Sequence, residues 1–321
     1  MELKLEKIEG EYREGFFVQS LMKRAWRAQL EILKEIDRIC RKYNITYLMS
    51  CGSVLGAVRH HGFIPWDDDL DIEMTRPNYE RFRKIALTEL QSPFVLGDCM
   101  RTDMMFESLI MRVANTDLPY CLEQSFLDKF AGCPYQMGVD VFCMDMLPDD
   151  PDAVSEMTNL AVMANGVTYQ WDNLSVEERT AILNTLTDVT GYRFNPNLSI
   201  KQQCVRLADQ ISGMYADIKE GTLTRVYMSA ELKTFFFPSQ MYEDIIMVPF
   251  EDMQVPILRD YDYYLRHLYG NGYMTPVKFT SMHDYPCFQG AIDALKNRFA
   301  ELDIPFPKEF DMEPLDPATL P

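Results

Sequence analysis

The residues best suited to chemistry lie in the stretch from Tyr47 to Glu73. Asp67, Asp68 and Asp69 are consecutive, and Asp71 follows after Leu70. Carboxylates this close repel one another unless a cation lies among them. The residues between and before them are apolar: Phe63, Ile64, Trp66, Leu70 and Ile72. Acids set among apolar residues indicate a strand that carries carboxylates into a cleft, where they can hold a metal ion for phosphate chemistry.

A strand over Asp69–Ile72 would place two acids on one face. Because side chains alternate between the faces of a strand, Asp69 and Asp71 would point the same way, about 6–7 Å apart along the strand. Oxygen-only ligands suit Mg²⁺ or Mn²⁺ better than zinc. The spacing therefore predicts that Asp69 and Asp71 bind Mg²⁺ or Mn²⁺.

A Gly52-Ser53 pair lies upstream, between the apolar run 45–49 and the run 54–58. This order predicts strand, tight turn and helix start, where backbone N–H groups and a hydroxyl can hold phosphate. A calcium-binding EF-hand loop starting at Asp67 is excluded. It would need Gly at its sixth position and Glu at its twelfth, where this chain has Ile72 and Asn78.

The run from Gly52 to Asp71, GSVLGAVRHHGFIPWDDDLD, closely resembles the signature of the LicD family. Its bacterial members are phosphocholine transferases, its animal members include fukutin and fukutin-related protein, and it belongs to the nucleotidyltransferase superfamily. The resemblance implies an α+β fold, with a nucleotidyltransferase-like mixed sheet flanked by helices. It also implies that Asp69 and Asp71 are catalytic and that a third acid follows on a later strand.

Asp140 lies in the apolar run 136–142 and matches the G-x-D-x-F pattern that the family has at this place. An unpaired acid inside a strand is costly. Two interpretations are open: Asp140 is hydrogen-bonded or salt-bridged, with Arg112 as the partner, or it is the third metal ligand and a catalytic residue, as the resemblance implies. Asp145 and the pair Asp149-Asp150 are expected in a solvated loop.

The resemblance further implies a CDP-alcohol donor, CDP-choline first, with CMP as the leaving group. The implied acceptor is a hydroxyl of a surface polysaccharide, a teichoic acid or another glycan or polyol. Relatives that move ribitol phosphate leave the alcohol open. The predicted substrate-binding residues are Gly52, Ser53, Arg59, His60, Trp66 and Asp68. Arg59 and His60 are expected to contact phosphate, although Arg59 could instead pair with Asp67 or Asp68, and Trp66 could face a cationic head group.

Two other functions are weighed against this one. A glycosyltransferase also uses a DxD motif to hold a metal-bound nucleotide, but it needs a long nucleotide-binding segment before the motif, and the segment from Ile45 to Asp69 is short. An inactive member of the family could act as a nucleotide-binding scaffold. Retention of Asp69, Asp71 and Asp140 together disfavours the scaffold, because binding alone would not need all three.

The elements that must position these residues are also visible. Residues 20–43 and 77–90 have the apolar spacing of amphipathic helices, and residues 94–96 and 109–113 are expected to be strands. A capping box at Ser175–Glu178 opens a further helix, and residues 199–219 have helical spacing. Residues 247–256 predict a hairpin, followed by a helix that Gly270 closes. We divide the chain into a catalytic core (1–150), a helical insertion (151–233), the C-terminal part of the core (234–304) and an extended tail (305–321).

Composition excludes one class of partner. The chain has 321 residues, 47% of them hydrophobic, and a net charge of −18 with no basic stripe, which excludes a nucleic-acid partner. Its eight cysteines are scattered without a CxxC pair, so free thiols are expected. No signal peptide or apolar run long enough to span a membrane is visible. We therefore expect a cytoplasmic protein without a transmembrane segment, and leave open a peripheral membrane contact through the acceptor.

Overall fold

A computed structural model describes residues 4–228, 235–277, 287 and 289–312. At its centre lies a mixed sheet with the strand order β3-β4-β7-β6-β5, extended by β8 and β9 beyond β7. The strands are β3 (Leu48–Met49), β4 (Asp71–Thr75), β5 (Val95–Gly97), β6 (Met111–Ala114), β7 (Gly138–Met146), β8 (Thr222–Thr224) and β9 (Phe237–Pro238). Strands β4 and β7 are parallel and the other pairs are antiparallel. The α+β prediction is confirmed.

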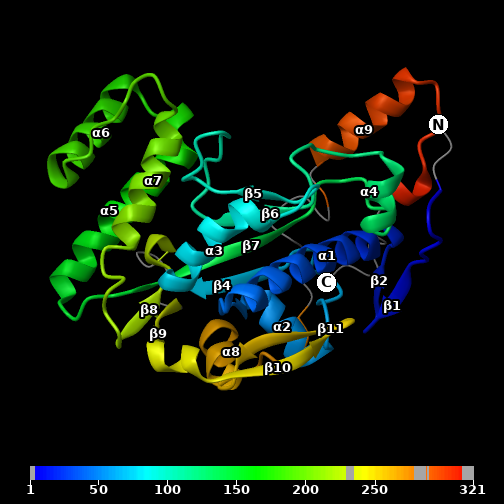
Figure 1. The fold of residues 1–321 in the computed structure, drawn as a ribbon, viewed down its shortest axis with the longest axis horizontal. Coiled ribbons are helices and arrows are strands. Elements are labelled where there is room, and N and C mark those ends of the chain that lie inside the picture. The colour runs from blue at the N-terminus through cyan, green and yellow to red at the C-terminus, as the bar shows by residue number, and fades with distance from the viewer. Residues whose placement is uncertain (1–3, 229–234, 278–286, 288, 313–321) are drawn as a thin grey trace.

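Helix α1 (Ser20–Tyr43) has the predicted bounds because its apolar residues form one continuous face. Leu21, Ala25, Ile32 and Ile36 are all fully buried on that face. Asn44 ends the helix in the left-handed conformation, with its N–H bonded to the Cys40 carbonyl. Helix α1 contacts β6, β7 and the helix α3 (Arg76–Glu89), which also packs on β4 and β7 (Figure 1). These two helices therefore support the strand that begins at Asp71.

The ends of the chain return to the acidic motif. A first hairpin pairs β1 (Glu11–Arg13) with β2 (Phe16–Val18). The predicted second hairpin is formed by β10 (Ile245–Phe250) and β11 (Met253–Leu258), and helix α8 (Tyr261–Tyr269) follows and ends at Gly270. This hairpin and α8 pack against β3 and the helix α2 (Cys51–His60), as Figure 1 shows below the sheet. The packing brings residues from both halves of the chain to one site.

The remaining helices include α4 (Gln124–Lys129) and α9 (Gln289–Glu301). The expected extended tail differs in part from the structure, because a short 3₁₀ helix spans Lys308–Phe310 and Phe310 is fully buried. Residues 313–321 of that tail lie outside the described residues. Among the helices of the described chain, none has both the length and the apolar character needed to cross a bilayer. All eight cysteines lie in described segments as free thiols, as expected, with Cys51 and Cys121 half-buried and the others buried.

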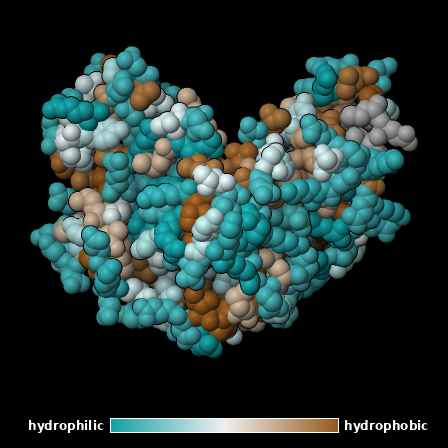
Figure 2. All heavy atoms as spheres, viewed as in Figure 1, coloured by the Kyte–Doolittle hydropathy of each residue, from teal (hydrophilic) through white to brown (hydrophobic). Residues whose placement is uncertain are grey.

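Residues 151–212 form what we call the helical arm: α5 (Pro151–Gln170), α6 (Val176–Thr190) and α7 (Ile200–Ser212). The predicted capping box opens α6, with Ser175 and Glu178 bonding each other's backbone N–H groups. Helix α7 is shorter than predicted. The arm has a hydrophobic core of its own, which includes Met157, Ala161, Val167, Leu186, Leu207 and Ile211. Figure 2 shows the arm standing to one side of a deep notch in the outline, with a mainly hydrophilic surface in this view.

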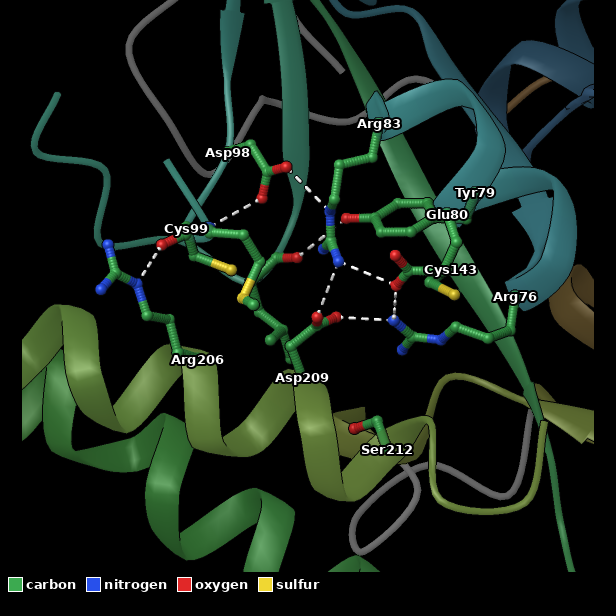
Figure 3. A network of polar contacts seen from close by, with 12 residues as sticks. Arg76, Tyr79, Glu80, Arg83, Asp98, Cys99, Cys143, Arg206, Asp209 and Ser212 are labelled. Atoms are coloured by element: carbon green, nitrogen blue, oxygen red, sulfur yellow. Dashed lines mark hydrogen bonds and ion pairs between the residues drawn. The ribbon is translucent and has the colours of Figure 1, made fainter. Parts of the chain in front are cut away.

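A buried ionic network joins the helical arm to the sheet (Figure 3). Asp209 of α7 accepts hydrogen bonds from Arg76 and Arg83 of α3, at 2.7 and 3.0 Å. Arg76 Nε also lies 2.6 Å from Asp145 Oδ1 on β7. Asp145 is only 2% exposed, so the expectation that it lies in a solvated loop is wrong. A buried carboxylate is tolerated there because Arg76 supplies the compensating charge.

Candidate active site

The acidic motif opens onto a cavity of about 470 Å³. Asp67 and Asp69 reach it from the loop between α2 and β4, and Asp71 reaches it from the first position of β4. Asp69 thus precedes the strand, whereas the sequence predicted it within one. The other lining residues come from α2 and the loop after it (Cys51, Gly52, Leu55, Arg59, Ile64) and from the C-terminal segment (Tyr269, Gly272, Tyr273, Thr275, Val277). The cavity therefore has one wall that carries carboxylates and one that is largely apolar and aromatic.

Backbone hydrogen bonds fix the position of Asp71. Its carbonyl accepts from the Ser50 N–H at 3.0 Å, and its N–H donates to Ser53 Oγ at 2.8 Å. Ser50 and Ser53 flank the start of α2, so the start of the helix is tied directly to the start of β4. Ser53 is buried and does not line the cavity, and its hydroxyl holds the strand in place.

Two carboxyl groups of the cavity, Asp67 and Asp71, have raised pKa values. Burial, then the charges of Asp69 and Asp140, raise the pKa of Asp71 well above its ordinary value, although Arg225 opposes this. Burial, then Asp69 and Asp68, raise the pKa of Asp67 in the same way. The fully ionised cluster is thus unfavourable without a cation. Perturbed carboxyl groups that share a cavity are typical of functional sites.

Asp140 lies directly beside Asp71, as its pairing in the parallel β4–β7 ladder requires. On its other side the ladder places Arg112 of β6, whose Nε is 2.7 Å from Asp140 Oδ1. The structure thus contains the salt bridge that the sequence left open, and Asp140 does not line the cavity. In the described part of the chain, no three His, Cys, Asp or Glu side chains converge closely enough to form a ready-made metal site.

The predicted phosphate contacts separate into two groups. Gly52 and Arg59 line the cavity, and Arg59 Nη1 donates to the Tyr273 carbonyl at 2.7 Å instead of pairing with Asp67 or Asp68. His60 accepts from Arg59 Nε at 2.8 Å and its Nδ1 lies 2.8 Å from Glu14. Burial lowers the pKa of His60 despite Glu14, so a neutral ring with a proton on Nδ1 fits both contacts. With both nitrogens engaged, His60 orients Arg59 and does not face the cavity.

Trp66 and Asp68 are also away from the cavity. Trp66 is 3% exposed and packs edge-on against Phe16 and His60, so the expected contact between its ring and a head group has no support. Asp68 is buried, and its carbonyl accepts from Gln29 of α1 at 2.5 Å. Both residues brace the loop that carries Asp67 and Asp69.

The sequence analysis did not predict a buried ion pair that lies behind the site. Glu73 of β4 and Arg225 lie 3.1 Å apart, and both are almost fully buried. Tyr242 and Tyr264 donate to Glu73 at 2.7 and 3.3 Å, and Tyr264 also accepts from the Cys51 N–H. The sequence did hint at Glu73, because Asp69, Asp71 and Glu73 follow one another at every second position, so Glu73 continues the alternation of acids. Arg225 carried no local signal.

Two glycines of α2 give a test of the packing here. A methyl group on Gly56 would meet the Gly62 carbonyl oxygen at 2.4 Å, whereas one on Gly52 would meet only the Asp67 carboxylate, at 3.0 Å. Because a backbone oxygen cannot rotate away, we expect Gly56→Ala to lower the free energy of unfolding by about 1–3 kcal/mol. Gly52→Ala should leave it nearly unchanged and displace Asp67 instead. Urea unfolding of both variants measures this, and equal losses would contradict it.

Comparison with known proteins agrees with this site. Residues 44–121 match the family model described as LicD/FKTN/FKRP, nucleotidyltransferase domain. The lipopolysaccharide cholinephosphotransferase LicD of Haemophilus influenzae is 25% identical over 251 residues, which are 75% of this chain and 87% of that protein. An uncharacterized protein of Rickettsia typhi is 42% identical over 55 residues, which are 17% of this chain and 18% of that protein. The family match spans β3, α2 and the acids before and in β4, so the chain is similar to the LicD family over the segment that carries the acidic site.

Proposed function

We propose that the protein is a metal-dependent transferase that moves phosphocholine from CDP-choline to a hydroxyl of a cell-surface glycan or its precursor, with release of CMP. The observation that carries this proposal is that Asp67, Asp69 and Asp71 all line one cavity, where burial and the neighbouring carboxylates disfavour the ionised forms of Asp67 and Asp71 unless a cation is bound. The similarity to a lipopolysaccharide cholinephosphotransferase supports the choice of alcohol.

The donor set fits a hard divalent cation. Asp69 and Asp71 offer only oxygen ligands, and the carboxylate of Asp140 is close enough to Asp71 to raise its pKa. These three residues would hold Mg²⁺ or Mn²⁺, with Arg112 as a competing partner of Asp140. Such an ion, when bound, neutralises charge on the diphosphate and on the departing CMP.

The chain's own residues would bind and orient the donor. Gly52 presents backbone without a side chain at the cavity wall, so a phosphate can approach α2 closely there. Two of the five N–H groups of Arg59 are engaged by Tyr273 and His60 among the described residues, so its guanidinium can still contact phosphate oxygens. Ser53 would act indirectly, through the backbone of Asp71.

The reaction itself needs an acceptor and a base. The acceptor hydroxyl would attack the phosphorus that carries the alcohol, the anhydride bond would break, and CMP would leave with the bridging oxygen. A carboxylate takes the proton that the hydroxyl loses. The sequence proposes Asp140 for this role, and Asp67 is a second candidate because its raised pKa makes it a stronger base than an exposed aspartate.

Release of CMP tests the proposal. With Mg²⁺ present we expect release of CMP from CDP-choline, and EDTA should abolish it. CDP-ethanolamine, CDP-ribitol and CDP-glycerol serve as parallel donors, with mass spectrometry following both products. Metal-dependent binding of CDP-choline without turnover would show that an acceptor is required. Neither turnover nor binding would contradict the transferase and favour a scaffold role.

A further inference from the structure

The apolar wall of the cavity is built by the end of α8 and the segment after it. Tyr269 is the last residue of α8, and Gly270, with φ of 78°, turns the chain back so that residues 272–277 also reach the cavity. Tyr269 is 44% exposed, and the aliphatic residues Leu55, Ile64 and Val277 line the cavity with it. An open aromatic side chain thus shares the cavity with the carboxylates of Asp67, Asp69 and Asp71.

The other aromatic side chains near the site are buried or bonded to other residues. Tyr273 lines the cavity but is only 7% exposed; its hydroxyl donates to Asp262 at 2.8 Å, and the Arg266 guanidinium lies 5.8 Å from its ring. Tyr264 is fully buried against Phe237 and Glu73. Trp66 is buried in the core. Among the described residues that line the cavity, Tyr269 is therefore the aromatic side chain with surface to offer a ligand.

This combination suits a cation that cannot donate hydrogen bonds. A quaternary ammonium group is attracted by an aromatic face and by nearby carboxylates, and its methyl groups pack on aliphatic side chains. A neutral polyol would instead leave its hydroxyls without partners against Leu55, Ile64 and Val277. The aromatic and aliphatic part of the cavity lining is thus matched to charge and shape more than to hydrogen bonding.

We propose that Tyr269 is the specificity-determining residue for the transferred alcohol and that its ring contacts a quaternary ammonium head group. This inference rests on the proposed transferase function and assigns the head group to the wall formed by α8 and residues 272–277. Tyr269 selects the alcohol, whereas the aspartates act at the diphosphate. Its role is in binding, so it can be tested without turnover.

Calorimetric binding of two matched ligands to the full chain tests this role. Phosphocholine and 3,3-dimethylbutyl phosphate have the same shape, and only the first carries the positive charge. With Mg²⁺ present we expect the wild-type protein to prefer phosphocholine about tenfold, within the range of a cation–aromatic contact. Tyr269→Phe should keep this preference because the ring remains. Tyr269→Leu should reduce it to less than about twofold.

Tyr263→Leu is the matched control. Tyr263 lies on the same helix and is also 44% exposed, but it stacks on His267 and does not line the cavity, so its loss should leave the preference unchanged. Equal binding of the two ligands by the wild-type protein, or an undiminished preference in Tyr269→Leu, would overturn the assignment.

The test of Tyr269 and the test of the transferase reaction can fail independently. CMP release from CDP-choline without any preference for the cation would keep the transferase and remove Tyr269 from the head-group site. A preference that depends on Tyr269, in a protein that releases no CMP, would keep the head-group site and reject the reaction.

Discussion

Replacing Asp71 by asparagine should lower the rate of CMP release from CDP-choline by about a thousandfold or more. Asp71 stands at the start of β4, where both its backbone groups are fixed and its side chain lines the cavity. The substitution keeps the shape and removes one negative ligand, and losing the charge stabilisation that a bound metal gives the transition state costs several kcal/mol. Steady-state assays at saturating Mg²⁺ measure the loss.

The same substitution should not weaken the fold. In the wild-type protein the ionised Asp71 is disfavoured by burial and by Asp69 and Asp140, so the neutral amide removes repulsion. In EDTA the free energy of unfolding of Asp71→Asn should thus equal or exceed that of the wild type. Added Mg²⁺ should stabilise the wild type and leave the variant nearly unchanged. Asp149→Asn, in an exposed loop, is the control that should behave as wild type in both assays. Full turnover by Asp71→Asn would remove it from the catalytic residues.

Local patterns were the part of the structure that the sequence could predict. The spacing of apolar residues located α1, the Ser175–Glu178 box located the start of α6, and the glycine at position 270 located the end of α8. Each of these signals lies within a few residues of the feature that it specifies. Asp69 and Asp71 both line the cavity, as their spacing predicted, but Asp69 does so from the loop before β4 and not from the strand.

Asp140 shows where such reasoning stops. Its place in an apolar strand predicted that it needs a partner, and the sequence offered both a metal and Arg112. Only the sheet order β4-β7-β6 shows that Asp71 and Arg112 flank it on the two neighbouring strands. The choice between the two partners depends on strand pairing, which the sequence around Asp140 does not specify.

Packing between distant segments of the chain explains the other features that the sequence did not predict. Arg225 reaches Glu73 from a segment far along the chain, and it is held there between the rings of Phe142 and Phe235. Tyr269 meets the acidic motif because α8 packs on α2. Asp145 was expected in a loop because its partner, Arg76, lies on a helix far away in the sequence, where it also pairs with Asp209. Such contacts depend on how entire helices and strands pack against one another, so no local sequence pattern predicts them.

Replacing Asp209 by asparagine should cost about 3 kcal/mol of the free energy of unfolding, the largest loss we expect from any single isosteric change in the helical arm. Asp209 is 5% exposed and accepts from both Arg76 and Arg83, so its loss leaves two buried guanidinium groups short of a counter-charge. Arg76 keeps Asp145, and Arg83 keeps Asp98 at 2.8 Å, which limits the damage. Urea unfolding with the same slope for both proteins measures the difference.

Asp172→Asn is the matched control. Asp172 also pairs with a cation in the arm, Lys201 at 2.7 Å, but its side chain is 79% exposed, so its replacement should change the free energy of unfolding little.

The loss of unfolding free energy in Asp209→Asn should depend on pH. Burial raises the pKa of Asp209, but Arg76 and Arg83 outweigh it and hold that pKa below its ordinary value of 3.8. Its stabilisation is therefore complete above that value and disappears as the pH falls through the lowered pKa. The difference in the free energy of unfolding between the two proteins should be constant from pH 5 to 7 and narrow below about pH 4. If this difference in the free energy of unfolding instead widened in acid, the Asp209 charge would oppose folding. The ionic network would then not be the feature that holds the arm to the sheet.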